Sequence, residues 1–269
     1  MLAVTILGNN SALSMHDRHQ TAQIVTTEDQ LFLVDCGEAT QLQMERYKIK
    51  KSKINHIFIS HLHGDHYYGL PGLLNTFTLT NRTTPLHLYA TPELKELIDL
   101  QLRVSSSSFG FEFNFHPITT AETLLDLPGI SVDCFPVSHR IPCWGFIFKT
   151  KGKTARVKEG ETLREPIPPS SYAFCADSKY DESILEHIKG CNLVYHESTY
   201  LDDQAEKAEA RFHSTSTGAA TIALKANAGR LLLGHFSSKY PDLTPFETEA
   251  RQTFPGAEVS KEGVTYLIN

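Results

Sequence analysis

Six consecutive residues, 61–66, read His-Leu-His-Gly-Asp-His and directly follow the apolar run at 57–60. In an extended segment the side chains alternate between faces, so His61 and His63 point the same way. A turn that begins at Gly64 can bring Asp65 and His66 to the same side. Imidazole nitrogen and carboxylate oxygen suit zinc, with manganese or iron as substitutes, and no thiolate lies nearby. This segment, called the His box below, predicts an open, catalytic metal site at the end of a strand.

The size and composition of the chain favour a globular enzyme. Its 269 residues, 41% of them hydrophobic, are enough to bury a large core, and we expect residues 1–269 to form a single domain. No apolar run approaches the roughly 20 residues that cross a membrane, and the first residues lack a basic leader. Five scattered cysteines form no Cys-x-x-Cys pair, which predicts reduced thiols and a cytoplasmic location. A net charge of −6 disfavours nucleic-acid binding over a broad basic face.

The order of the predicted elements repeats along the chain. Apolar or alternating runs predict strands at 22–35 and 54–60, with a helix at 39–48 between them. The aromatic, alternating stretch 105–120 predicts another strand. Residues 172–198 repeat the order strand, Asp turn, helix, strand, His turn, about 140 residues after the first occurrence. We therefore expect two similar αβ halves stacked sheet to sheet.

Three further metal-ligand candidates follow predicted strands. His139 follows the strand at 130–137, Asp177 follows the strand that begins at Tyr172, and His235 follows the apolar run ending at Gly234. Strand ends hold catalytic groups in place while the loops remain free to vary. Together with the His box, these residues predict a site for two cations. The histidines expected to be surface or structural are His16, His19, His56, His87, His116 and His187.

These pieces together resemble the metallo-β-lactamase superfamily. More narrowly, they resemble the ribonuclease Z family, endonucleases that mature tRNA 3′ ends. The resemblance covers nearly the whole chain, and its most specific pieces are the Gly-Glu-Ala-Thr-Gln turn at 37–41, His-Glu-Ser-Thr at 196–199, His-Ser-Thr at 213–215 and His-Phe-Ser-Ser-Lys-Tyr at 235–240. It implies the α/β fold of that superfamily, a four-layer αββα sandwich.

The resemblance also implies a set of metal ligands. One Zn²⁺ would be held by His61, His63 and His139, the other by Asp65, His66 and His235, and Asp177 would bridge the two.

A catalytic scheme accompanies these ligands. Two dications lower the pKa of a shared water and supply hydroxide for attack on a phosphodiester. Asp65 is a candidate to receive the water's proton. His213 is the candidate donor to the leaving 3′ oxygen, and by resemblance Glu197 hydrogen-bonds it. Asp35 is expected to orient a ligand histidine or to serve the structure.

Two segments depart from the family pattern. Bacterial members carry a long Gly/Pro-containing arm that grips the tRNA from the partner subunit, whereas the interval between His139 and Asp177 holds a short basic segment, 149–158, and the Pro-rich 166–169. We expect a reduced arm, partly replaced by Lys151, Lys153 and Arg156. A homodimer is what the resemblance implies. The loop at 14–19 keeps only Arg18 of the family's Pro-x-Lys-x-Arg-Asn pattern, so discrimination against mature CCA ends is expected to differ.

The predicted function is a zinc-dependent endoribonuclease that removes 3′ trailers from tRNA precursors. The alternative is a phosphodiesterase of the same superfamily that acts on small or cyclic nucleotides, which the short arm and the acidic charge favour. A β-lactam or thioester hydrolase fits less well, because Asp65, His66 and the Asp177 bridge are the two-metal phosphodiesterase pattern. An inactive binding module that kept the fold would bind no metal.

Overall fold

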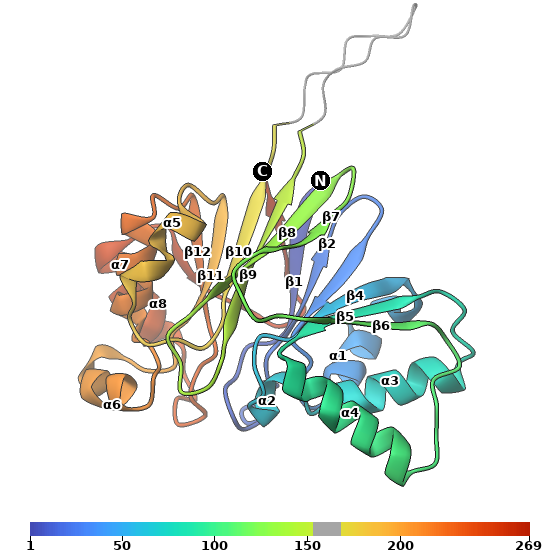
Figure 1. The fold of residues 1–269 in the computed structure, drawn as a ribbon. Helices are drawn as coiled ribbons and strands as arrows, with labels where there is room; N and C mark the ends of the chain where they lie inside the picture. Colours follow the sequence, from blue (N-terminus) through green and yellow to red (C-terminus); the bar gives the residue numbers. More distant parts are fainter. Residues whose placement is uncertain (153–167) are drawn as a thin grey trace, which may run out of the picture.

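Two β-sheets face each other in the computed structural model, which describes residues 1–152 and 168–269, and helices cover the outer face of each sheet (Figure 1). The first sheet has the strand order β14 (Thr265–Ile268), β1 (Leu2–Gly8), β2 (Ala22–Thr26), β3 (Leu31–Val34), β4 (Ile54–Phe58), β5 (Leu86–Ala90), β6 (Phe113–Pro117). The second has the order β13 (Ala257–Val259), β12 (Arg230–Gly234), β11 (Leu193–Glu197), β10 (Ser171–Cys175), β9 (Trp144–Thr150), β8 (Ile130–Pro136), β7 (Thr123–Asp126). This is the αββα sandwich that the sequence predicts.

The helices divide between the two outer layers (Figure 1). On the side of the first sheet lie α1 (Thr40–Arg46), α2 (Gly64–Tyr67), α3 (Leu70–Leu79) and α4 (Pro92–Val104). On the side of the second lie α5 (Leu185–Ile188), α6 (Ala205–Ala210), α7 (Ser216–Lys225) and α8 (Thr244–Thr253). Short 3₁₀ turns occupy Lys51–Lys53, Glu182–Ile184 and Asp202–Gln204.

Alternation along the strands separates two cores. Phe32 and Phe58 face the second sheet, whereas Leu33 and Ile57 face the helices on the other side. Between the sheets, the ring of Phe58 lies 5.4 Å from that of Phe146. Complete burial of such a side chain stabilises the fold by roughly 1.5–3 kcal/mol. The period of two in the strands therefore places one set of side chains between the sheets and the other under the helices.

Two predicted strands differ from the observed ones. The stretch 22–35 forms two strands, β2 and β3, because a turn in which the backbone N–H of Gln30 donates to Thr27 Oγ1 at 3.2 Å reverses the chain. The stretch 105–120 contributes only β6, and Phe109 and Phe111 lie before it in a loop, their rings 5.2 Å apart. Aromatic packing, rather than sheet pairing, explains the apolar pattern there.

The parallel strands fix where a site can form. Strands β3 to β6 are parallel to one another, and so are strands β10 to β13. The carboxyl ends of parallel strands meet at one edge, where binding sites of such folds lie.

At the opposite edge, Lys149 pairs with Asp133 and Lys151 with Asp126. Lys153 and Arg156 of the predicted basic hairpin lie outside the described residues. Within the described residues, every helix is too short or too polar to cross a membrane.

Three histidines that the sequence assigns to structural roles stack on adjacent strands, apart from the His box. His56 on β4 pairs with His87 on β5, their rings 4.9 Å apart. His87 Nδ1 lies 3.0 Å from Nε2 of His116 on β6. Burial lowers the pKa of His56 to about 4, and charge on His87 and His116 acts in the same direction.

The buried His56 should make stability depend on pH. Between pH 6.5 and about 4 the unfolded chain binds a proton at residue 56 that the folded chain excludes. The free energy of unfolding should therefore fall as the pH falls through this window, by about 3 kcal/mol for this group. Urea unfolding at several pH values checks it: His56→Phe, which keeps the ring but cannot titrate, should show a flatter dependence than the natural chain. Parallel curves would contradict the assignment.

Candidate metal centre

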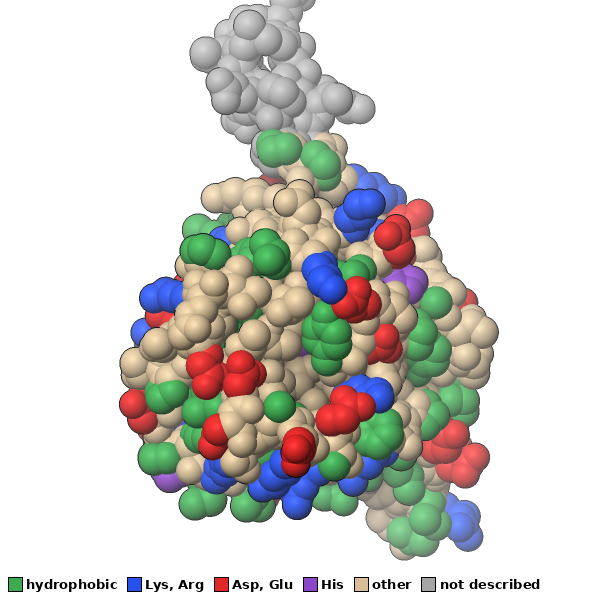
Figure 2. All heavy atoms as spheres, turned by 90° about the vertical axis from the view of Figure 1, so that its left-hand side faces the viewer, with side chains coloured by type: hydrophobic (Ala, Val, Ile, Leu, Met, Phe, Trp, Pro, Cys, Tyr) green, Lys and Arg blue, Asp and Glu red, His purple; other side chains and the backbone are tan. Residues whose placement is uncertain are grey.

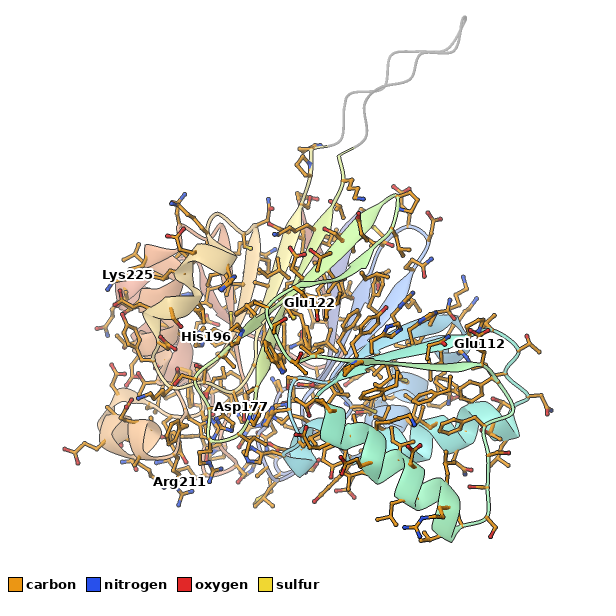
Figure 3. All side chains as sticks on the ribbon, in the orientation of Figure 1. Glu112, Glu122, Asp177, His196, Arg211 and Lys225 are labelled. Carbon is orange, nitrogen blue, oxygen red and sulfur yellow. The ribbon has the colours of Figure 1, made fainter. Side chains whose placement is uncertain are left out.

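Seven side chains from four segments meet at the edge where the parallel strands end. The His box follows β4 and runs into α2, and it supplies four of them. Loops after β8, β10 and β12 supply the other three. Figure 3 shows Asp177 at this lower edge, between the two halves of the molecule. The full set is His61, His63, Asp65, His66, His139, Asp177 and His235, and all seven lie in the two groups described next.

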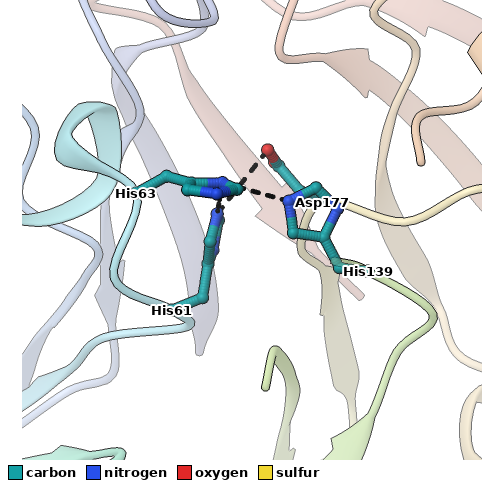
Figure 4. A group of neighbouring side chains, drawn as sticks. All are labelled: His61, His63, His139 and Asp177. Carbon is teal, nitrogen blue, oxygen red and sulfur yellow. Dashed lines mark hydrogen bonds and ion pairs between the residues drawn. The ribbon is translucent and has the colours of Figure 1, made fainter. Parts of the chain in front are cut away.

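The first group contains His61, His63, His139 and Asp177, whose ligand atoms all lie within 4.8 Å of one another (Figure 4). His63 Nδ1 lies 3.0 Å from His61 Nε2 and 3.1 Å from His139 Nε2. Asp177 Oδ2 lies 3.8 Å from His61 Nε2. Three imidazole nitrogens and one carboxylate oxygen thus converge on a small volume.

The second group contains Asp65, His66, Asp177 and His235. Asp177 Oδ1 lies 3.3 Å from His66 Nε2 and 3.2 Å from His235 Nε2. Asp65 Oδ2 lies 3.3 Å from His235 Nε2. Asp177 therefore presents one carboxylate oxygen to each group, which is the geometry of a bridging ligand.

Asp35 lies beneath the His box and orients it. It follows β3 in a left-handed backbone conformation, with φ 54°, and is completely buried. Its carboxylate accepts hydrogen bonds from the backbone N–H of Ser60 at 2.7 Å, the Ser60 hydroxyl at 2.9 Å and His66 Nδ1 at 2.7 Å. Because Nδ1 donates to Asp35, the His66 ring is held with Nε2 facing the site.

Hydrogen bonds from the second half fix two more rings. His139 Nδ1 donates to the Phe212 carbonyl at 3.0 Å, and His235 Nδ1 donates to Thr199 Oγ1 at 2.9 Å. Both rings therefore present Nε2 as a lone pair to the site. His235 itself follows β12 with a left-handed φ of 58°.

The arrangement fits divalent cations. His66 Nε2 and His235 Nε2 lie 3.3 Å apart, and Asp177 Oδ1 lies within 3.3 Å of both, so three donor atoms surround one small volume of a size that suits a cation. Among the described residues, the buried Asp177 Oδ1 accepts no hydrogen bond, so it is an unsatisfied anionic oxygen. Nitrogen and carboxylate donors of this kind suit zinc and similar metals.

The carboxylates of the site are ionised at neutral pH. Burial would raise the pKa of Asp177, but His235 and His66 outweigh it and hold that pKa well below the ordinary value. Burial likewise opposes ionisation of Asp65, and charge on His66 and the hydrogen bond from His235 lower its pKa to about 2. The negative charge that attracts cations is therefore present in the folded protein.

His213 and Glu197 form an ion pair beside the cluster. His213 Nδ1 donates to Glu197 Oε1 at 2.7 Å, and the His213 ring lies 5.4 Å from that of His235. Burial would lower the pKa of His213, but Glu197 outweighs it and raises the pKa to about 9. The His213 side chain is 13% exposed and that of Glu197 1%. His213 is thus a protonated group at the surface of the site, able to donate a proton.

Thr199 joins these two parts, a role that the sequence reasoning missed. Its hydroxyl donates to Glu197 Oε2 at 2.8 Å and accepts from His235 Nδ1 at 2.9 Å. Its backbone N–H also donates to Glu197 Oε2, at 2.9 Å. A threonine two residues after a carboxylate commonly forms such local bonds, which is the one sequence signal available. The Phe212 contact uses a backbone carbonyl and leaves no signal in the sequence.

Several known proteins are similar to this chain over most of its length. A family model described as Anti-Pycsar protein Apyc1 matches residues 2–250. A protein named Ribonuclease Z from Parabacteroides distasonis is 37% identical, with 98% of each chain covered. Another Ribonuclease Z, from Cytophaga hutchinsonii, is 39% identical over 98% of this chain and 95% of its own.

Solved structures give the same fold. Human tRNase Z, short form, has a TM-score of 0.81 and 27% identity, with 99% of both chains covered. The metallo-β-lactamase fold protein YhfI from Bacillus subtilis has a TM-score of 0.80 at 20% identity, with 98% of both chains covered. The fold is thus shared with these proteins over nearly the whole chain.

Proposed function

This chain belongs to the ribonuclease Z family, and on that premise we propose that it is a metal-dependent endoribonuclease that removes 3′ trailers from tRNA precursors. One observation carries the proposal most directly. A two-part His/Asp cluster bridged by Asp177 lies beside the protonated His213, whose ring is 5.4 Å from that of His235. A cation site next to a proton donor suits cleavage of a phosphodiester with a poor leaving group.

Two zinc ions are the proposed cofactors, with manganese or iron as substitutes. His61, His63 and His139 would hold one ion, Asp65, His66 and His235 the other, and Asp177 both. When bound, the two cations lower the pKa of water and offset the negative charge that develops on the phosphate. The predominance of imidazole donors and the lone pairs aimed into the site support this choice.

The chain's own groups supply the proton transfers. Asp65, with 11% of its side chain exposed, would receive the proton of the attacking water. His213 would donate its proton to the leaving 3′ oxygen, and Glu197 holds the Nδ1 side of that ring. Asp35 and Thr199 keep the ligand histidines in the orientation described above.

The membership of the ribonuclease Z family also bears on the domain organisation, the location and the oligomeric state. We propose a single domain of two similar halves, a cytoplasmic location and a homodimer. Five unpaired, buried cysteines support a reducing compartment. Exposed apolar side chains on α4, namely Leu97, Leu100 and Val104, offer a surface for a second copy.

A metal count combined with mapping of the cut tests the function. We expect two metal ions per chain and a cut of a tRNA precursor between the tRNA and its trailer, leaving a 3′-hydroxyl on the tRNA. Cyclic nucleotides and bis(p-nitrophenyl) phosphate serve as comparison substrates. Faster turnover of cyclic nucleotides together with an intact precursor would favour the alternative, a small-nucleotide phosphodiesterase.

A further inference from the structure

Two lysines lie over the same tyrosine ring beside the candidate metal centre. Lys207 Nζ is 5.3 Å from the centroid of the Tyr200 ring, and Lys239 Nζ is 5.8 Å from it. Lys239 Nζ is also 4.5 Å from the centroid of the Tyr240 ring. Ammonium groups are attracted to the face of an aromatic ring, so the rings hold both lysines in place. We call Lys207, Lys239 and Tyr200 the Tyr200 rim.

The charges of the rim are not neutralised within the protein. Across residues 1–152 and 168–269, neither lysine forms an ion pair, whereas the nearby Lys179 pairs with Glu209. Arg211, exposed and also without an ion pair in that part of the chain, directly follows α6. The ammonium groups of Lys207 and Lys239 are therefore available to an anionic ligand, although Asp202, Asp203, Glu206 and Glu209 lie in the same segment as Lys207.

The rim lies at the same edge as the catalytic groups. The Tyr200 ring is 6.3 Å from that of His213, and Leu201 N–H donates to the Tyr240 hydroxyl at 3.2 Å. Figure 3 shows Arg211 and Asp177 at the lower edge, and Figure 2 shows Lys and Arg side chains gathered along the lower edge of the face that carries α6. Tyr200 is only 4% exposed, so its ring supports the lysines and is not available to stack on a base.

The direction of the RNA strand follows from the role of His213. In an in-line displacement the attacking and leaving oxygens lie on opposite sides of the phosphorus. If His213 protonates the leaving 3′ oxygen, the nucleotide that carries this oxygen, the last of the tRNA, lies on the His213 side. The attacking water lies on the opposite side, and the trailer is attached through its 5′ oxygen, which is neither the attacking nor the leaving oxygen and points away from their common axis. The Tyr200 rim lies beyond His213 and would meet the tRNA, not the trailer.

We propose that Lys207 and Lys239 bind backbone phosphates at the acceptor end of the tRNA, and that Tyr200 positions both lysines. This inference rests on the proposed function and adds the polarity with which the substrate lies in the site. Contacts to phosphates position a nucleic acid without reading its sequence, which suits an enzyme that must accept many tRNAs.

The test uses the double substitution Lys207→Ala/Lys239→Ala. Its matched control is Lys50→Ala/Lys53→Ala, which removes the same charge from two exposed lysines before β4, at the strand end opposite the His box. Kinetics are measured with a tRNA precursor and with bis(p-nitrophenyl) phosphate. Inhibition is measured with the two products separately, the tRNA ending in a 3′-hydroxyl and a 5′-phosphorylated trailer oligonucleotide.

We expect the rim variant to raise KM for the precursor and the inhibition constant of the tRNA product by about tenfold or more, and to reduce the slope of log KM against log salt by about 2. Inhibition by the trailer, turnover of bis(p-nitrophenyl) phosphate and all values of the control variant should stay unchanged.

Three results would overturn the inference. An unchanged KM for the precursor would show that the rim does not bind RNA. Weakened inhibition by the trailer with unchanged inhibition by the tRNA would reverse the polarity. If the natural chain hydrolyses bis(p-nitrophenyl) phosphate but leaves the precursor intact, the proposed function itself fails, and the inference fails with it.

Discussion

Replacing His213 with alanine should lower kcat for a tRNA precursor by about 10²–10⁴-fold, the usual contribution of a positioned general acid, while the metal content stays unchanged. The reason is geometric. His213 contacts Glu197 at 2.7 Å and belongs to neither of the two groups that contain Asp177; with Glu197 and His235 it forms a third group of possible ligands, but its Nδ1 donates to Glu197. Steady-state kinetics on the precursor, with metal analysis of the same preparation, measures both quantities.

A substrate whose leaving group needs no proton tests the role of His213 more specifically. The p-nitrophenolate ion leaves without a proton, so His213→Ala should hydrolyse bis(p-nitrophenyl) phosphate at close to the natural rate. His187→Ala is the matched control, because it removes an exposed histidine whose ring stacks on Phe135 at 5.2 Å, in the layer of α5. Equal losses on both substrates, or full activity on the precursor, would contradict the role of a proton donor.

Replacing Asp177 with asparagine should reduce both the metal content and the activity, the latter by at least about 10³-fold. Asparagine keeps the shape but offers one neutral oxygen where the carboxylate presents Oδ1 to His66 and His235 and Oδ2 to His61. Loss of several kcal/mol of charge stabilisation corresponds to this factor. Metal analysis after dialysis, and titration of the metal-free protein by calorimetry, measure the loss directly.

The control for Asp177 is Asp181→Asn, four residues later. Asp181 accepts a hydrogen bond from Ser183 N–H at 2.9 Å and belongs to neither group of candidate ligands. This variant should keep the metal and the activity. An Asp177→Asn protein that binds two ions with unchanged affinity would show that the bridge is not needed, and the two-metal proposal would then have to be abandoned.

The proximity of the seven candidate ligands could be predicted from the sequence, because few backbone geometries are open to the segments that carry them. The His box compresses four polar groups into six residues, and Asp177 and His235 each follow an apolar run that can only be a buried strand. Parallel strands place their carboxyl ends at one edge, so residues far apart in the chain must meet there. The meeting of these residues required no knowledge of side-chain detail.

The parts that were not predictable depend on loops. Thr199, Phe212 and Lys207 act through the fold of the segment after β11, whose path is set by contacts such as Tyr200 N–H to the Ser214 carbonyl at 3.3 Å. No periodic pattern encodes such a path. The turn between β2 and β3 was missed for a related reason, since residues 27–30 contain neither glycine nor proline to mark it.

The left-handed backbone at Asp35 and His235 indicates that the protein retains two site residues at a cost in folding stability. For residues other than glycine this conformation costs roughly 1–2 kcal/mol, and it occurs at Asp35, directly after β3, with φ 54°, and at His235, directly after β12, with φ 58°. Glycine at these two positions would relax the main chain and make the folded protein more stable, but would remove a carboxylate and an imidazole that the site uses. The loops that carry the candidate site therefore lower the free energy of unfolding below the value that this fold could reach.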